Sequence, residues 1–437
     1  MTFRLHQPHT LTLLALVIFL TLAGCAPARD EPANQTKVQV NSGILVGAPM
    51  GENGGVFLGV PFAAPPVGDL RWSDPVSLAP WAGERSATSF APACMQGDYT
   101  TDWYAVVIED FGSDPSLAAR PVSESEDCLY LNVWTPELKA DAGLPVMVWI
   151  HGGGYSGGWS YEPNYIAGRL AERGVIVVSI GYRLGAFGYF GPDEGANFGL
   201  MDQIKALEWV QDNIREFGGD PKNVTVFGES AGAASVGTLM VAPRAAGLFN
   251  RAIHQSGGFE FIEQTTSQDA ARAFAKLAQS LPAPDVRAAT SQDVFDATQS
   301  VLSDQWYTPA KDGDWLPETP QTLLQQGGVH EVELMIGTNA DEWLMYIDTE
   351  TLDEQIASWK SRMPDANVLI DDLIVQHGEI GALDRIETAH QMRCPGQSLA
   401  RAIGEKNKAV FFYRFSRVRP SEQVAKIGSY HGAEIPY

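Results

Sequence analysis

One pentapeptide of the chain has the residue types and spacing of a nucleophilic site, namely Gly228–Gly232 with the sequence GESAG. It follows a short β-branched and aromatic run at 224–227 and precedes a run of small and apolar residues at 233–240, so it lies where a buried strand turns into a helix. Glycines flank the serine because side chains there would clash on so tight a turn. The pattern predicts a nucleophile elbow carrying Ser230, although the pentapeptide alone is a weak motif.

An elbow serine needs a base, a carboxylate that orients the base, and donors for an oxyanion. With this kind of elbow the chain order is serine, acid, histidine. Of the eight histidines, His431 lies in a small-residue loop after the last clear strand, and we predict it as the base. The others are expected to leave with the leader (His6, His9), to be structural at strand ends (His151, His254), or to lie on the surface (His330, His377, His390).

Two neighbouring carboxylates could orient this histidine. Asp341 and Glu342 follow a predicted strand at 332–336, at the sheet edge where catalytic loops gather. The pattern does not choose between them, and we expect one to face the histidine and the other to cap a helix.

A glycine run is the candidate source of oxyanion donors. His151–Gly154, with the sequence HGGG, follows a predicted apolar strand at 145–150. Consecutive glycines let backbone N–H groups approach a substrate oxygen closely, and such a loop is the usual partner of the elbow.

The elements that must position these residues can be read from apolar periodicity. Between 197 and 218 apolar residues recur at steps of three and four, which predicts an amphipathic helix. Alternating apolar strands and helices predict an α/β fold with a large, mostly parallel central sheet, helices on both faces and long loop insertions, in one elaborated domain. Strands are expected at 37–46, 56–60, 129–134, 145–150, 174–181, 224–227, 251–255, 332–336 and 410–415, and helices covering a sheet face at 267–281 and 291–303. No regular structure is expected at 61–68, and mostly loop is expected from there to about residue 127.

Composition restricts the partners. The chain has 437 residues, of which 45% are hydrophobic, so it can bury a large core. Its net charge of −23 argues against nucleic acids and anionic surfaces as partners. The acidic residues are distributed along the chain, as is typical of a solvated surface. No cofactor and no metal site is expected.

The first segment is interpreted as a targeting signal. Arg4 precedes an apolar run at 11–22 that is too short to span a membrane. The run ends in Leu22-Ala-Gly-Cys25, which resembles a bacterial lipobox. That resemblance implies cleavage after 1–24, lipidation of Cys25, and an outer-membrane anchor facing the periplasm or the cell surface, with no other membrane contact. An ordinary secretory signal is the alternative.

Residues 25–36 are then a flexible tether before a domain at 37–437. Export would allow Cys94 and Cys128 to form a disulfide, which leaves Cys394 without a partner.

Several long motifs carry a family resemblance that covers nearly all of 37–437. They lie at 57–66, 125–134, 145–154, 197–203 and 217–232. The chain resembles the type-B carboxylesterase family of α/β-hydrolases, which includes bacterial carboxylesterases and cholinesterases. The resemblance implies a serine carboxylic ester hydrolase that acts through an acyl-enzyme on small to medium carboxylic esters. A non-catalytic binding or adhesion module of the same fold and an amide hydrolase are the alternatives.

The resemblance also implies residue roles. The nucleophile, acid and base would be Ser230, Glu342 and His431; the oxyanion donors would be the N–H groups of Gly153, Gly154 and Ala231; Glu229 and Ser256 would be polar neighbours of the triad; and Cys94–Cys128 would be a disulfide over the site entrance. Trp103, Tyr104, Tyr155 and Trp159 are expected to reach the substrate gorge, or else to be hydrophobic filler.

The end of the chain departs from the family pattern. Family members continue through further helices, whereas this chain ends at Tyr437, six residues after His431. A missing C-terminal part is therefore expected, which would remove the partner of Cys394, leave the His431 loop poorly packed and expose apolar surface.

Overall fold

The structure, a computed structural model, describes residues 36–192, 197–262, 265–283, 285–420, 422 and 424–437. The predicted signal peptide, Cys25 and all but the last residue of the predicted tether lie outside these residues. No helix in the described part is long and apolar enough to cross a membrane.

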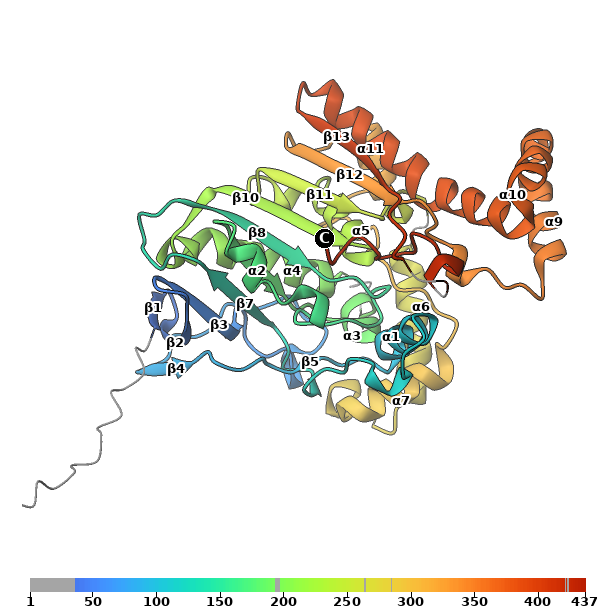
Figure 1. Cartoon of the computed structure of the whole chain (residues 1–437). Helices are drawn as coiled ribbons and strands as arrows, with labels where there is room; N and C mark the ends of the chain where they lie inside the picture. Colours follow the sequence, from blue (N-terminus) through green and yellow to red (C-terminus); the bar gives the residue numbers. More distant parts are fainter. Residues whose placement is uncertain (1–35, 193–196, 263–264, 284, 421, 423) are drawn as a thin grey trace, which may run out of the picture. The chain divides into compact units, whose positions relative to one another are not determined.

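An eleven-stranded sheet runs through the described part of the chain, with the order β1-β2-β3-β7-β9-β8-β10-β11-β12-β13 and β4 paired to β2 (Figure 1). From β9 to β13 in this order, consecutive strands pair in parallel, whereas the pairs β1–β2, β2–β3, β3–β7 and β7–β9 are antiparallel. The bounds are β1 Thr36–Val40, β2 Gly43–Met50, β3 Gly54–Pro61, β4 Glu84–Ser86, β7 Tyr130–Thr135, β8 Leu144–Ile150, β9 Ile176–Ile180, β10 Gly219–Glu229, β11 Arg251–Gln255, β12 Glu333–Asn339 and β13 Val410–Phe415. The predicted, mostly parallel centre of the sheet is confirmed.

Helices lie on both faces of this sheet. On β9, Val177 packs with Ala171 of α2, while its neighbour Val178 belongs to the main core together with Ile204 of α4. Successive strand residues point to opposite faces, so the two helices cover different sides. The helices are α1 Tyr99–Asp110, α2 Gly168–Ala171, α3 Gly185–Tyr189, α4 Phe198–Asn213, α5 Ala231–Leu239, α6 Ser267–Ser280, α7 Ser291–Val301, α8 Pro320–Gln325, α9 Leu352–Arg362, α10 Asn367–Thr388 and α11 Cys394–Glu405.

The segment predicted as mostly loop is mostly loop, but it also contains α1, which lies in the chain between β5 (Ala93–Cys94) and β6 (Glu124–Ser125), the two strands of a small separate sheet. One expectation about the helices is wrong. Helices α6 and α7 form as predicted, but they pack chiefly on each other. Phe274 of α6 meets the Trp72 ring edge-on, at 4.9 Å between centroids, so this helix covers a loop rather than the sheet face.

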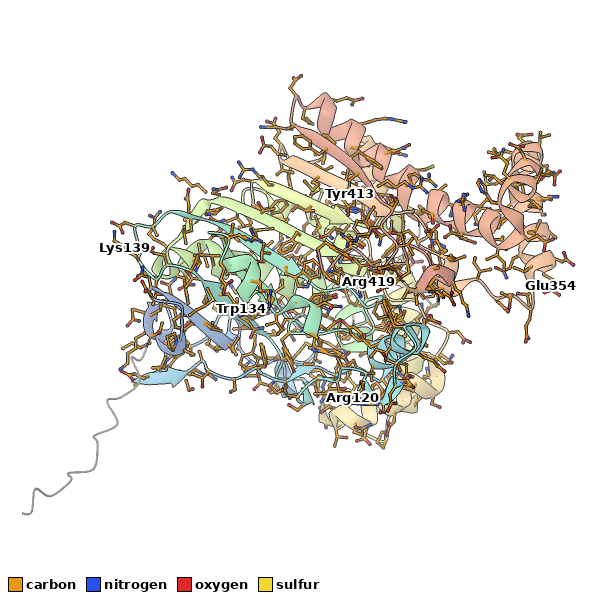
Figure 2. All side chains as sticks on the ribbon, viewed as in Figure 1. Arg120, Trp134, Lys139, Glu354, Tyr413 and Arg419 are labelled. Atoms are coloured by element: carbon orange, nitrogen blue, oxygen red, sulfur yellow. A yellow bond between two sulfur atoms is a disulfide. The ribbon has the colours of Figure 1, made fainter. Side chains whose placement is uncertain are left out.

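The last strand, β13, leaves apolar side chains uncovered. Phe411 is 64% exposed and its neighbour Phe412 is 43% exposed. These residues point to opposite faces, so neither face of β13 is fully covered. Tyr413, labelled in Figure 2, is held more closely, because a Cβ on Gly337 of β12 would lie 2.4 Å from its ring.

Candidate active site

Ser230 stands on a strained turn between β10 and α5. Its φ of 57° and ψ of −125° lie in a region that residues with side chains rarely adopt. The turn is tight enough to require glycine on both sides. A Cβ on Gly232 would lie 2.1 Å from the carbonyl oxygen of Ile150, and a Cβ on Gly228 would lie 2.7 Å from the same oxygen. The geometry is that of a nucleophile elbow.

His431 lies in the loop after β13, and its imidazole contacts two carboxylates. Nδ1 lies 2.7 Å from Oε2 of the fully buried Glu342. A carboxylate only accepts hydrogen bonds, so Nδ1 carries the proton and Nε2 is left for other chemistry. Nε2 lies 3.3 Å from Oε1 of Glu229, the residue before the elbow serine.

Glu342 is itself held by two short hydrogen bonds. Its Oε1 accepts from the Ser256 hydroxyl at 2.5 Å and from the Asn339 N–H at 2.5 Å. Ser256, expected near the triad, therefore touches the acid rather than the serine.

Asp341 does not cap a helix, and that expectation is wrong. Its Oδ2 accepts from the N–H of Ser429 at 2.9 Å, while its own N–H donates to the Ser429 carbonyl at 3.2 Å. The pair of bonds ties the Glu342 loop to the His431 loop two residues before the histidine. The open choice between Asp341 and Glu342 is thus decided by geometry, since Glu342 faces the imidazole.

The His431 loop is well packed, contrary to expectation. Asn339 Nδ2 donates to the Tyr430 carbonyl at 2.8 Å and to Glu434 Oε2 at 2.6 Å. Tyr430 and Ala433 are buried in a small apolar cluster that also includes Val107 of α1. The loop therefore rests on α1 and is tied to the end of β12.

Burial and neighbouring charge shift the titration of this group. Burial raises the pKa of Glu229 to about 8, while the nearby imidazole of His431 opposes the shift. Burial would lower the pKa of His431, but the carboxylates of Glu229 and Glu342 raise it to about 10. The imidazole thus binds a proton more strongly than an isolated histidine does.

The glycine run lies against the elbow. A Cβ on Gly152 would lie 3.2 Å from Cβ of Ser230. Gly153 and Gly154 have φ values of 102° and 61°, and Ala231 is the first residue of α5. Within the described residues, no hydrogen bond uses the N–H of Gly153, Gly154 or Ala231, so these donors are free to bind an oxygen. The helix dipole of α5 adds to their attraction for negative charge.

A cavity of about 390 Å³ opens beside these groups. Ser230, Glu229 and His431 line it, as do Gly153 and Gly154. Among the predicted gorge residues, Trp103, Tyr104 and Tyr155 also line it. Sequence reasoning missed the other aromatic and polar wall residues, which include Tyr99, Glu162, Tyr165, Phe259, Trp306, Tyr307, Trp343, Tyr346 and Gln391. Trp343 directly follows Glu342, so its position in the chain could have predicted that it lies at the site. The other wall residues carry no such signal in the sequence.

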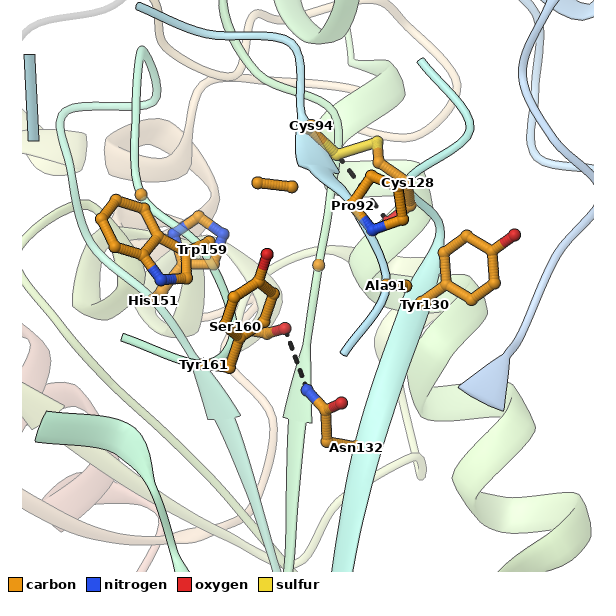
Figure 3. Close-up of a pocket in the computed structure, with 13 residues that line it drawn as sticks. Ala91, Pro92, Cys94, Cys128, Tyr130, Asn132, His151, Trp159, Ser160 and Tyr161 are labelled. Atoms are coloured by element: carbon orange, nitrogen blue, oxygen red, sulfur yellow. Dashed lines mark hydrogen bonds between the residues drawn. A yellow bond between two sulfur atoms is a disulfide. The ribbon is translucent and has the colours of Figure 1, made fainter. Parts of the chain in front are cut away.

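Trp159 does not line this cavity and is buried in an apolar cluster with Tyr104, as the alternative of hydrophobic filler predicts. It lines a separate space of about 10 Å³ beside the Cys94–Cys128 disulfide (Figure 3). The disulfide is formed, with 4.9 Å between the Cα atoms, and it brackets the segment that contains α1. Cys394 is free and exposed.

Among the described histidines other than His431, none lines the cavity beside Ser230. His151 is buried against the Tyr182 ring, with 4.4 Å between centroids, and burial lowers its pKa to about 4. His254 is buried, 2.8 Å from Glu260. The expected surface position is right for His377 and wrong for His330 and His390, which are half-buried. Among the described residues, no group of His, Cys, Asp and Glu side chains is arranged to hold a metal ion.

Fold and site together define a class. A mixed, mainly parallel sheet carries a serine on a strand-to-helix elbow, and a histidine and a buried carboxylate lie at the same cavity. This is the α/β-hydrolase fold with the parts of a serine hydrolase.

Comparisons with known proteins give the family. The model of the carboxylesterase family matches residues 34–379, which include Ser230 and Glu342 and end before His431. The chain is 34% identical to fumonisin B1 esterase of Sphingopyxis macrogoltabida, over 90% of this chain and 73% of that protein. It is 33% identical to acetylcholinesterase of Bungarus fasciatus, over 97% of this chain and 76% of that protein.

A solved structure titled PNB esterase matches with a TM-score of 0.74 at 30% identity, covering 92% of this chain and 84% of that one. The chain belongs to the carboxylesterase family, and it is a serine carboxylic ester hydrolase.

Proposed function

We propose that Ser230 is the nucleophile of this esterase, that His431 is its general base and that Glu342 orients and stabilises the imidazole. The observation that carries the proposal is the 2.7 Å bond between His431 Nδ1 and Glu342 Oε2, made at the cavity that Ser230 lines. It fixes the tautomer in which Nε2 can accept a proton.

The reaction would run in two halves. Ser230 Oγ attacks the ester carbonyl carbon while His431 Nε2 takes the hydroxyl proton, and the oxyanion is held by the N–H groups of Gly153, Gly154 and Ala231. The C–O bond to the alcohol breaks as His431 returns the proton to the leaving oxygen. Water then attacks the acyl-enzyme with the same proton transfers, which releases the acid and restores Ser230. Loss of one oxyanion donor typically costs about 3 kcal/mol of barrier.

Small to medium carboxylic esters are the proposed substrates. The cavity of about 390 Å³ falls within the range of small-molecule sites, and aromatic side chains form much of its wall. A panel of p-nitrophenyl esters of increasing acyl length tests this, and we expect kcat/KM to fall once the acyl chain outgrows the cavity.

The role of Ser230 is tested by substitution. Ser230→Ala should abolish turnover of p-nitrophenyl butyrate and labelling by a fluorophosphonate, whereas Ser280→Ala, on the exposed end of α6, should change neither. Turnover retained by Ser230→Ala at the wild-type rate would remove the serine from the mechanism.

We further propose that residues 1–24 direct export and that Cys25 carries the lipid, with 25–36 as a tether to a hydrolase domain at 37–437. The supporting observation is the apolar run that ends in Leu22-Ala-Gly-Cys25. The full chain expressed in a Gram-negative host should incorporate radiolabelled palmitate and sediment with outer membranes, and Cys25→Ser should do neither. Equal palmitate incorporation by Cys25→Ser would contradict the assignment.

A further inference from the structure

The wall of the Ser230 cavity holds two carboxyl groups and, among its described residues, no lysine or arginine. The carboxyl groups are those of Glu162 and Glu229. The other titratable lining groups are His431, already bonded to Glu342, and tyrosines. A substrate anion in this cavity therefore finds no free cationic side chain.

Glu162 is a buried carboxyl that the proposed reaction does not use. It is 3% exposed. Its Oε2 accepts from the Tyr104 hydroxyl at 2.6 Å, and its Oε1 accepts from the Trp159 N–H at 3.0 Å. Burial raises its pKa to about 7, so in weakly alkaline solution it is largely ionised.

The rest of the wall favours uncharged groups. Trp103 and Tyr104 of α1, together with Tyr346 and Trp343 after β12, give it an aromatic lining. Trp103 Nε1 donates to the Tyr346 hydroxyl at 2.8 Å. The polar groups of both side chains therefore bond each other, and the ring surfaces remain available to contact the carbon chains of a substrate.

A substrate carboxylate away from the reacting carbonyl loses hydration in such a cavity without gaining a lysine or arginine partner, because the oxyanion donors are taken by the carbonyl oxygen. Removing a carboxylate from water is costly unless it is paired, and like charges nearby add to the cost. We propose that the cavity selects its substrates by charge, accepting esters whose acyl and alcohol groups are neutral and excluding esters that carry a carboxylate, with Glu162 as a specificity-determining residue. This rests on the proposed role of the Ser230 site.

The test compares two substrates of the same shape. Mono-p-nitrophenyl adipate ends in a carboxylate, and p-nitrophenyl adipamate ends in the isosteric carboxamide. At pH 8.5 and 0.15 M salt, we expect kcat/KM of the amide to exceed that of the anion at least about tenfold, the order of effect of one unscreened charge at close range. Raising the salt to 0.5 M should leave most of the difference, because buried charges are screened less than surface charges.

Variants distinguish the effect of charge in the cavity wall from the effect of the net charge of the whole chain. Glu162→Gln should reduce the amide-to-anion ratio severalfold, while Glu172→Gln, the same change at an exposed position after α2, should leave the ratio unchanged. Gln391→Arg, which adds a cation to the wall, should also reduce the ratio and does not depend on Glu162→Gln folding.

A wild-type ratio near one would overturn the inference, as would equal effects of Glu162→Gln and Glu172→Gln. If wild-type protein hydrolyses neither ester, the proposed function of the Ser230 site fails and the charge selection fails with it. Hydrolysis of both esters at the same rate would contradict the charge selection and leave the proposed function of the Ser230 site intact.

Discussion

Asp341 and Glu342 are adjacent carboxylates with different tasks. Glu342 is fully buried with its Oε2 on the His431 imidazole, whereas Asp341 bonds the backbone of Ser429. Sequence pattern could not separate them, because the choice depends on a loop about ninety residues further along the chain. Only tertiary structure brings that loop to the end of β12.

The difference predicts unequal effects of equal substitutions. Glu342→Gln keeps the shape but can hold His431 in the wrong tautomer, so we expect kcat for p-nitrophenyl butyrate to fall by about 10³–10⁴-fold. Asp341→Asn keeps a hydrogen-bond acceptor for Ser429 and should cost less than about tenfold. Steady-state kinetics on both variants test this prediction. A greater loss of kcat in Asp341→Asn than in Glu342→Gln would indicate that Asp341, and not Glu342, is the acid of the triad.

Glu229 should govern the pH dependence. A general base acts in its neutral form, and the carboxylates of Glu229 and Glu342 outweigh burial to raise the pKa of His431 from 6.5 to about 10. The value of kcat/KM should therefore rise with pH, and the midpoint of this rising limb of the pH profile should lie above pH 6.5. Glu229→Gln removes one of these carboxylates, so the imidazole loses its proton more easily and the limb should move to lower pH.

The measurement is kcat/KM against pH for wild type, Glu229→Gln and the exposed control Glu172→Gln. A limb that stays in place in Glu229→Gln would show that Glu229 does not set the pKa of His431.

At the scale of elements, the disulfide-bracketed helix α1 contacts both the cavity wall and the His431 loop. Its Val107 packs with the buried residues of the His431 loop, and its Trp103 bonds Tyr346. The helix escaped prediction because its buried face includes Thr100 and Thr101, so no apolar stripe marks it.

Removing the disulfide should therefore affect stability and catalysis together. Cys94→Ser with Cys128→Ser opens a loop of 34 residues, and we expect the free energy of unfolding to fall by about 2–4 kcal/mol. Loosening of α1 should also lower kcat. Cys394→Ser, at a free and exposed position, should change neither in denaturant titrations and ester assays. An unchanged unfolding midpoint in the double variant would contradict this role of the disulfide.

The strands of the sheet were the most predictable elements. Strands β8 and β9 are buried on both faces, so their sequences are continuous apolar runs that no exposed segment would carry. The amphipathic patterns of α6 and α7 predicted helices but not their packing partners. Such a pattern indicates that one face of a helix is buried, but it does not indicate which element covers that face. Ser230 and the glycine run were predictable because local backbone geometry demands those residues.

At the scale of the whole molecule, the outer strand β13 exposes apolar side chains at an edge of the sheet. Among the described strands it pairs only with β12, and Phe411 on it is largely exposed. An uncovered apolar edge favours association with other chains. The protein should therefore self-associate as its concentration rises.

Phe411→Lys should reduce that self-association in sedimentation velocity experiments. The control is Leu117→Lys, which makes the same charge change at an exposed apolar residue away from the sheet edge. Equal effects of the two variants would attribute the change to net charge instead of to β13.

The central claim is that ester hydrolysis passes through an acyl group on Ser230. Rapid mixing of the full chain with p-nitrophenyl acetate, followed by acid quench and peptide mass spectrometry, tests it most directly. We predict a burst of p-nitrophenol and an acetyl group on the peptide that contains Ser230, with both absent in Ser230→Ala. Steady turnover with the acetyl group on another residue, or with the burst intact in Ser230→Ala, would contradict the account.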